Sequence, residues 1–180
     1  VNVCVPTGNF GNILAAYYTT RMGLPVQKLI CASNANNVLT DFLRTGVYDR
    51  NRPFHTTTSP SMDILISSNL ERLLWLLSGS DAQVRGYMDS LRQTGRYEIS
   101  PALLEAVQAS FYAGFCDDTQ TARTIRSVFR EKRYLLDPHT AVGYGVLADY
   151  RERTGDSLPT ILASTASPFK FCGSVLEALG

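Results

Sequence analysis

The fold of this chain is decided by the stretch PTGNFGN at residues 6–12, which joins an apolar run to a helical pattern. The run before it, VNVCV at residues 1–5, is typical of a buried strand. After it, apolar residues recur at helical spacing over residues 12–22. A glycine-containing turn between strand and helix lets backbone N–H groups converge at the positive end of the helix dipole. The stretch therefore predicts a strand, an anion-binding turn and a helix in succession.

Two more apolar runs, at residues 28–32 and 160–164, have the character of buried strands. The helix between the first two strands is expected to end at Gly23 and Pro25, because glycine suits a C-cap and proline cannot continue a helix. Since strands alternate with helices, we predict an α/β fold in which a parallel sheet is flanked by helices.

Helical spacing of apolar residues predicts five further helices. One begins with Ser61 as its N-cap, carries Met62 and Leu70 on its apolar face, and ends at Gly79. The others cover residues 101–111, 121–133, 141–154 and 174–179. The most polar part of the chain lies before the second of these helices. We place a weak internal boundary there, near residues 80–100, within one unit of residues 1–180.

The composition is that of an ordinary globular unit, with 180 residues, 44% hydrophobic residues and a net charge of +1. Lysine and arginine are scattered without a basic run, which argues against nucleic acid or an anionic membrane surface as a partner. The longest apolar stretches fall far short of the roughly 20 residues that a membrane helix needs. Nothing resembles a signal peptide, so we expect a cytoplasmic protein.

The four cysteines stand mostly in apolar runs, without a C-x-x-C pair and without histidines at ligand spacing. This pattern predicts buried thiols and no metal site. The cysteines are Cys4, Cys31, Cys116 and Cys172.

Several polar residues allow both a binding and a structural interpretation. The glycine turn alone would also fit a tight turn capped by asparagine, and it matches no nucleotide fingerprint. In the binding case, Asn9 and Asn12 would add side-chain donors. Asn34 and Asn36 follow a strand end, where open α/β sheets place ligands, but asparagine is also an ordinary cap residue. For His139, which stands in a DPHT turn before a helix, the structural interpretation is favoured.

The chain as a whole resembles the threonine synthases. The turn at residues 6–12 looks like their phosphate-binding loop, and four other stretches resemble family segments in family order. They are SNANNVL at 33–39, SMDILISSNLER at 61–72, DPHTA at 137–141 and STA at 164–166. The resemblance spans nearly all 180 residues. The related serine and threonine dehydratases usually carry a loop richer in consecutive glycines, so this turn favours threonine synthase.

The resemblance implies a pyridoxal 5'-phosphate (PLP) enzyme of fold type II, similar to the tryptophan synthase β subunit, of which this chain would be the C-terminal portion. The cofactor phosphate would be held mainly by main-chain N–H groups. The residues implied for this are Gly8, Asn9, Phe10, Gly11 and Asn12. Thr165 would face the pyridine nitrogen, and a neutral hydroxyl there leaves that nitrogen less protonated than a carboxylate would. Residue type alone would also allow Thr165 merely to end a strand.

The family reaction converts O-phospho-L-homoserine and water into L-threonine and inorganic phosphate, as a carbon–oxygen lyase of threonine biosynthesis. It requires a Schiff-base lysine, which the family carries upstream of the glycine loop. The lysines of this chain, Lys28, Lys132 and Lys170, match no family position for it. We therefore assign no catalytic residue in this chain and expect the chain alone to be inactive.

One stretch departs from the family pattern. SPFKF at residues 167–171 stands where many threonine synthases have a His-Pro-Ala-Lys-Phe-like run, which puts any substrate contact of Ser167 in doubt. The opening of the chain inside a core strand also predicts that upstream residues have been removed. An exposed sheet edge would then favour self-association.

Two other functions stay open. A different PLP enzyme of the same fold, such as a threonine or serine dehydratase-like lyase, would use a similar cofactor site. A stand-alone α/β module would bind a phosphate-bearing ligand without catalysis. Substrate assays on the intact enzyme separate the first from threonine synthase, and the opening of the chain inside a strand argues against the second.

Overall fold

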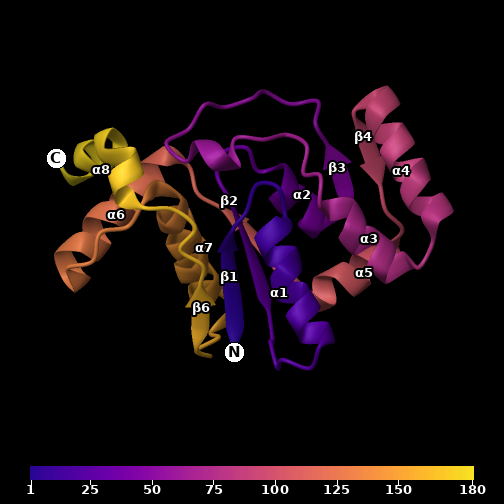
Figure 1. Cartoon of the computed structure of the whole chain (residues 1–180), viewed down its shortest axis with the longest axis horizontal. Helices are drawn as coiled ribbons and strands as arrows, with labels where there is room; N and C mark the ends of the chain where they lie inside the picture. Colours follow the sequence, from indigo (N-terminus) through magenta and orange to yellow (C-terminus); the bar gives the residue numbers. More distant parts are fainter.

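A parallel sheet of four strands forms the centre of the molecule in the computed structural model, which describes residues 1–180 (Figure 1). The strand order is β5-β2-β1-β6. The strands are β1 (Asn2–Pro6), β2 (Leu29–Ser33), β5 (Phe111–Phe115) and β6 (Thr160–Leu162). Val3 of β1 lies opposite Leu29 on one side and Ile161 on the other. The predicted parallel sheet is confirmed, although its last strand ends two residues earlier than expected.

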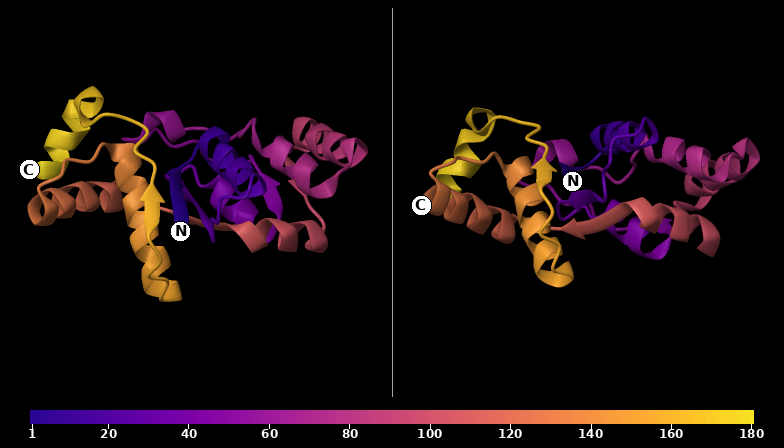
Figure 2. Two further views of the ribbon diagram at one scale, coloured as in Figure 1. Left: turned by 60° about the horizontal axis from the view of Figure 1, so that its bottom comes forward. Right: turned by 90° about the horizontal axis from the view of Figure 1, so that it is seen from below.

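Helices cover both faces of this sheet (Figures 1 and 2). The first face carries α1 (Gly11–Arg21), α2 (Val38–Thr45) and α5 (Pro101–Ser110), and the second carries α7 (Pro138–Thr154). Because successive side chains of a strand point to opposite faces, Val5 and Cys31 enter a core cluster of 22 buried residues on the first face. Cys4 and Ile30 enter a cluster of nine buried residues beneath α7. The predicted flanking helices are confirmed.

Two glycines allow α7 to lie close to the sheet. A Cβ at Gly143 would stand 2.8 Å from Leu162 Cδ1 and 3.1 Å from Pro6 Cγ. At Gly145 a Cβ would stand 2.7 Å from Cys116 Sγ. Since interiors are close-packed, these contacts set the start of α7 against the ends of β1, β6 and β5.

Further elements extend the molecule at both ends of the sheet (Figures 1 and 2). One end holds α6 (Asp118–Lys132), the 3-10 helix η2 (Pro168–Phe171) and α8 (Cys172–Leu179), whose apolar side chains gather with those of α7. The other end holds α3 (Leu70–Ser78), α4 (Asp81–Thr94) and the antiparallel strands β3 (Val47–Asp49) and β4 (Arg96–Glu98). None of the eight helices is both long and apolar enough to cross a bilayer.

The continuous helix predicted over residues 61–79 is wrong in its first half. The chain forms only a 3-10 turn, η1 (Pro60–Met62), before α3 begins. Between these two elements the chain is held by contacts from elsewhere. The Asp63 carboxylate accepts four hydrogen bonds, and the Tyr48 hydroxyl bonds twice to this segment. Gly79 ends α3 with a φ of 63°, as predicted.

The remaining predicted helices are confirmed with shifted ends. Those expected at residues 12–22, 101–111, 121–133, 141–154 and 174–179 are α1, α5, α6, α7 and α8. Ser100 caps α5, since its hydroxyl accepts from Leu103 N at 3.3 Å. Phe111, expected at the end of that helix, instead opens β5. The sequence pattern missed β5 as well as α2, α4, β3 and β4.

The polar segment near residues 80–100 forms α4 and β4. Three of its residues, Leu91, Tyr97 and Ile99, are buried in the same 22-residue cluster as the sheet. The internal boundary that we placed in this segment stays a prediction.

Three of the four cysteines are buried, as predicted, and the fourth is not. Cys4, Cys31 and Cys116 lie in the core, whereas Cys172 is exposed at the start of α8. Its predicted burial is wrong because α8 buries only its residues 175 and 178. Burial raises the pKa of the Cys31 thiol to about 12 and that of the Cys116 thiol to about 11. Both therefore stay protonated at neutral pH.

Candidate functional site

A cleft of about 360 Å³ opens where β1 ends and α1 begins. It lies at the carboxyl end of the parallel strands, which is where open α/β sheets place ligands. All six residues that the resemblance implied for the cofactor line it. Its walls contain no aspartate, glutamate, lysine or arginine. They consist of residues 5–12, Ser61, Met62, Asn69, His139, Thr165 and Ala166.

The turn between β1 and α1 presents a run of main-chain N–H groups without acceptors in the chain. Thr7 N donates to Ala32 O at 2.7 Å, and the next N–H with an acceptor is that of Leu14. The donors between them belong to Gly8, Asn9, Phe10, Gly11, Asn12 and Ile13. Convergent N–H groups at a helix N-terminus form a nest that binds anions.

Phe10 shapes the turn through its backbone conformation and anchors the turn through its buried side chain. Its backbone is left-handed, with φ 61° and ψ 4°, a conformation that costs free energy for a residue with a large side chain. Its ring is buried and packs against Phe111 with centroids 5.6 Å apart. Burial of a phenylalanine side chain contributes about 1.5–3 kcal/mol, which offsets the cost of the backbone.

Ser67, Ser68 and Asn69 hold the turn by its carbonyl groups, and we call them the clamp segment. Ser67 Oγ donates to Gly8 O at 3.0 Å, and Asn69 Nδ2 donates to Asn9 O at 2.7 Å. Ser68 donates through its N–H and its hydroxyl to Asn9 Oδ1, at 2.7 and 2.8 Å. Because the clamp segment engages only acceptors of the turn, the main-chain donors stay free for a ligand. The side-chain amide nitrogen of Asn9 also stays free.

The hydroxyl of Tyr48 holds the clamp segment in place. It accepts from Ser67 N at 2.8 Å and donates to Leu65 O at 3.0 Å. The ring is buried and stacks on Tyr97 of β4, with centroids 5.2 Å apart. Burial raises the pKa of Tyr48 to about 12, so the hydroxyl keeps its proton at neutral pH. The β3–β4 pair is thereby connected to the turn through Tyr48 and the clamp segment.

The 3-10 turn η1 forms a floor beneath Gly8. A Cβ at Gly8 would stand 3.1 Å from both Met62 Cα and Ser61 O, so a larger residue requires the main chain to move. Glycine is needed here because of this close approach and not because of a positive φ. The floor contacts His139, whose Nε2 accepts from Ser61 N at 3.2 Å.

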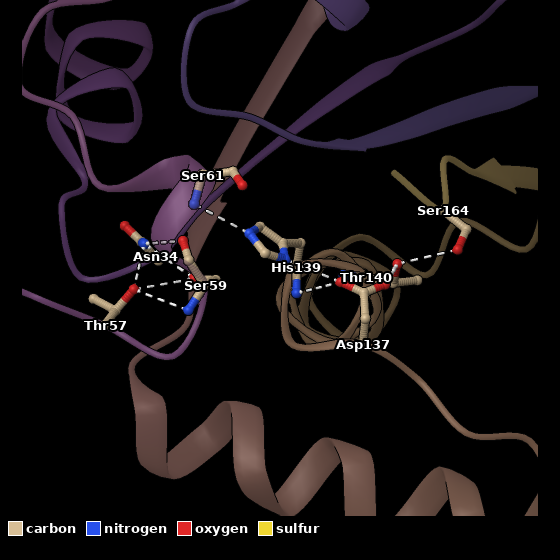
Figure 3. A network of polar contacts seen from close by, with 8 residues as sticks. All are labelled: Asn34, Thr57, Ser59, Ser61, Asp137, His139, Thr140 and Ser164. Carbon is tan, nitrogen blue, oxygen red and sulfur yellow. Dashed lines mark hydrogen bonds and ion pairs between the residues drawn. The ribbon is translucent and has the colours of Figure 1, made fainter. Parts of the chain in front are cut away.

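His139 is the one titratable side chain in the cleft wall. Its Nδ1 lies 3.0 Å from Asp137 Oδ1, and Asp137 also caps α7 by accepting from the N–H groups of His139 and Thr140 (Figure 3). Burial alone would raise the pKa of Asp137, but the hydrogen bonds from His139 and Thr140 outweigh it and lower that pKa. The expected turn and N-cap before α7 are present, and the imidazole of His139 also lines the cleft.

Thr165 lines the cleft from the segment that follows β6. The residue is exposed, and its hydroxyl has no partner in the chain. The neighbouring Ser164 Oγ lies 3.3 Å from Thr140 Oγ1, which ties this segment to α7. Ser167 does not line the cleft, in keeping with the doubt about its contact with substrate.

Asn34 and Asn36 do not line the cleft. The side-chain nitrogens of both donate to Asp63 Oδ1, at 2.7 and 3.0 Å. Asn34 also donates to Ser59 Oγ at 3.0 Å (Figure 3). Both residues are buried. They hold residues 57–63 against the end of β2, so their role here is structural, although neither caps α2.

Ser61, Met62 and Asn69 also line the cleft, and the sequence predicted no binding role for them. Ser61 and Met62 were placed on a helix, and Asn69 received no role. The signal that pointed to them was the resemblance of residues 61–72 to a threonine synthase segment, from which no site residue was predicted.

No lysine lies at the cleft. Lys28 Nζ donates to the carbonyls of Gln108 and Ala109 at 2.9 and 2.8 Å, at the end of α5. Lys132 and Lys170 are exposed. The chain itself therefore brings no primary amine to the nest.

Comparison with known proteins shows which family this chain is similar to. Residues 140–180 match the family described as "Threonine synthase, C-terminal". The chain is 46% identical to "Threonine synthase-like 1" of Homo sapiens and 41% identical to the threonine synthase of Eremothecium gossypii, over 99% of its length in both cases. It covers 24% and 38% of those two proteins. The PLP-bound threonine synthase of Brucella melitensis covers all of the chain with 47% identity and a TM-score of 0.94.

These comparisons confirm the predicted resemblance and the predicted fold. The chain has the fold type II architecture of the threonine synthases and corresponds to their C-terminal portion. It covers 38% of the Brucella melitensis structure and about a quarter of the human relative.

Proposed function

We propose, from this correspondence to the C-terminal portion of the threonine synthases, that the chain holds the phosphate of pyridoxal 5'-phosphate in the cleft between β1 and α1. The observation that carries the proposal is the run of free main-chain donors from Gly8 to Asn12. These donors stand at the N-terminus of α1, whose dipole favours an anion.

The residues present fit a phosphate better than they fit other ligands. The cleft wall has no carboxylate that would repel a dianion and no arginine or lysine that would bind it by charge alone. Binding would therefore rest on main-chain N–H groups, with the side chains of Asn9 and Asn12 as further donors. Gly8 keeps the backbone open to a close approach.

Thr165 would meet the pyridine nitrogen of the same cofactor. When bound, the cofactor supplies an electron sink for bonds broken at the substrate α-carbon. A neutral hydroxyl donates or accepts one hydrogen bond but does not stabilise a positive charge as a carboxylate does. Thr165 would thus moderate that electron sink. Its hydroxyl has no partner in the chain and is free for this contact.

The lysine that carries the cofactor and moves protons would come from residues outside this chain. None of the three lysines here lies at the cleft, and both nitrogens of His139 are engaged by Asp137 and Ser61. The full-length protein, meaning this chain with the rest of its natural polypeptide, would convert O-phospho-L-homoserine and water into L-threonine and phosphate. The chain alone would bind the cofactor without turnover.

The proposal extends to organisation and location. Residues 1–180 would form part of the large cofactor-binding domain, with the weak boundary near residues 80–100. We keep the cytoplasmic location as part of the same proposal, since the family reaction belongs to amino-acid biosynthesis.

An absorbance titration of the chain with PLP, with inorganic phosphate as competitor, tests the cofactor site. We expect phosphate-competed binding that Gly8→Ala weakens by about tenfold, because the new Cβ pushes the floor away from the nest. Gly86→Ala is the control, since Gly86 lies on α4 away from the cleft and its Cβ meets nothing within 4 Å. After borohydride, mass spectrometry should find no adduct. A stable adduct on Lys28, Lys132 or Lys170 would show that the chain has its own carrier lysine.

A second candidate function follows from the names of the relatives. The human protein at 46% identity is a "Threonine synthase-like 1" and not a threonine synthase by name. An enzyme that eliminates phosphate from the same substrate, and whose unsaturated product is hydrolysed by water to a 2-oxo acid and ammonia, would use the same cofactor site. Product analysis of the full-length protein with O-phospho-L-homoserine separates the two, because threonine supports the synthase and a 2-oxo acid with ammonia supports the elimination.

A further inference from the structure

A continuous chain of polar contacts joins two walls of the cleft (Figure 3). On one side, Ser61 belongs to the floor beneath Gly8. On the other, Ser164 directly precedes Thr165, which lines the cleft. Between them lie Asp137, His139 and Thr140, at the start of α7 and almost fully buried.

The contacts fix the protonation state of His139. A main-chain N–H can only donate, so the Nε2 that meets Ser61 N at 3.2 Å must be an acceptor without a hydrogen. The single ring proton then sits on Nδ1 and is donated to Asp137 Oδ1 at 3.0 Å. His139 is therefore a neutral imidazole with both nitrogens engaged, and an imidazolium would break the bond to Ser61.

The same reasoning gives the direction of the hydrogen bonds that Thr140 and Ser164 make. Thr140 Oγ1 donates its one hydrogen to Asp137 Oδ2. At 3.3 Å from it, Ser164 Oγ must therefore be the donor to Thr140. Asp137 accepts from both directions, and its negative charge stands at the positive end of the α7 dipole. Each hydrogen bond in this series, from Ser61 to Ser164, thus has one defined donor and one defined acceptor.

Capping of α7 does not explain His139. Asp137 caps the helix through the main-chain N–H groups of residues 139 and 140, and any residue other than proline at position 139 would supply that donor. The imidazole adds the contact to η1 and also packs against Phe171 of η2, with ring centroids 4.8 Å apart. It touches the three segments η1, α7 and η2, which come together only in the folded protein.

We propose that His139 is a positioning residue that sets the phosphate-binding wall of the cleft, at Gly8 and its floor, relative to the wall that carries Thr165. This inference rests on the proposed function. The nest itself is held from its other side by the clamp segment, independently of His139. Loss of the imidazole contacts should therefore leave each wall intact. It should lower only the affinity for a ligand that contacts both walls at once.

The test compares ligands that use one wall with a ligand that uses both, in the full-length apo-protein. His139→Phe keeps the ring and its contact with Phe171 but removes both hydrogen bonds. We expect this variant to bind PLP about tenfold more weakly, while inorganic phosphate and pyridoxal without phosphate each change by less than about threefold. His139→Gln, whose side-chain carbonyl can accept from Ser61 N, should recover most of the loss.

Other outcomes decide against the inference or against the function separately. If the wild type binds neither PLP nor phosphate, the proposed function fails. If the wild type binds both and His139→Phe weakens phosphate as much as PLP, His139 only supports the floor and the positioning role is wrong. Unchanged PLP binding in His139→Phe also overturns it.

Two measurements do not depend on the folding of the His139 variants. Nitrogen NMR of the wild-type imidazole should show the neutral form protonated at Nδ1, and an imidazolium or a proton on Nε2 would contradict the network. Ser164→Ala removes only the hydroxyl that ends this series of polar contacts. It should weaken PLP binding and leave phosphate binding unchanged. Equal PLP affinity in this variant and the wild type would overturn the proposal.

Discussion

The hydroxyl of Tyr48 is expected to matter for both stability and binding. In Tyr48→Phe the ring remains, but Ser67 N and Leu65 O lose their partner. Leaving buried main-chain groups unpaired costs about 1–3 kcal/mol. Because Ser67 also holds Gly8, phosphate affinity should fall together with stability. Urea denaturation and a phosphate titration of the full-length protein measure the two effects.

Tyr97→Phe is the matched control for this change. Tyr97 is as buried as its stacking partner, yet its hydroxyl makes no hydrogen bond in the chain. Removing it should leave phosphate affinity unchanged. If both variants behave alike, the connection through Ser67 does not hold the turn.

The carboxyl of Asp137 gives the fold a defined dependence on acid. Its folded-state pKa lies below the ordinary value, so its contribution to stability is present above that value and is lost as the pH falls through the folded pKa. The stability difference between the wild type and Asp137→Asn should be greatest near neutral pH and shrink below about pH 4. Denaturation at a series of pH values tests this, and a constant difference would show that the charge contributes nothing.

Neighbouring residues of the site could be predicted from the sequence, and distant ones could not. Gly8 to Asn12 form one local turn, so their type and order already indicate a nest. Ser61 and Asn69 join the cleft only because Asp63 and Tyr48 hold their segment in a non-helical path. No apolar spacing records such long-range hydrogen bonds.

The close contact of α7 with the sheet is the property of an element and not of one residue. Gly143→Ala places a methyl group 2.8 Å from Leu162 Cδ1, and overpacking of this kind costs about 1–3 kcal/mol. In Gly86→Ala, on exposed α4, the new methyl group meets nothing within 4 Å, so alanine should stabilise by about 0.5–1 kcal/mol. Urea denaturation measures the free energy of unfolding of both variants. A loss of stability in Gly143→Ala with a gain in Gly86→Ala would support close packing of α7, and a gain of stability in both would contradict it.

Elements with a strong apolar period were predicted and short ones were not. The helices α5 to α8 and the strands β1 and β2 carry their own signals, such as Ser100 before Pro101. Strand β5 reads as a continuation of α5 because Phe111 fits the helical spacing and no breaker separates the two. Only pairing with β2 identifies it as a strand, since Leu29 lies opposite Phe111.

For the whole molecule, the open edge of β6 predicts self-association of the chain when it is studied alone. β6 pairs only with β1, and its Ile161 is 58% exposed. Sedimentation should therefore show a mass that rises with concentration, and Ile161→Lys should lower it. Leu176→Lys, on α8 and 66% exposed, is the control away from the edge. A strictly monomeric chain would remove this prediction.

The run of donors in the turn also has a consequence for amide hydrogens. An N–H without an acceptor exchanges its hydrogen for deuterium readily, whereas the N–H groups of Ser67 and Ser68 are bonded and should exchange slowly with or without ligand. A phosphate seated in the nest would slow residues 8–12 and leave Ser67 and Ser68 unchanged. The two halves of the same site thus provide a signal and its internal reference, and deuterium uptake would report the fraction of molecules that carry the cofactor.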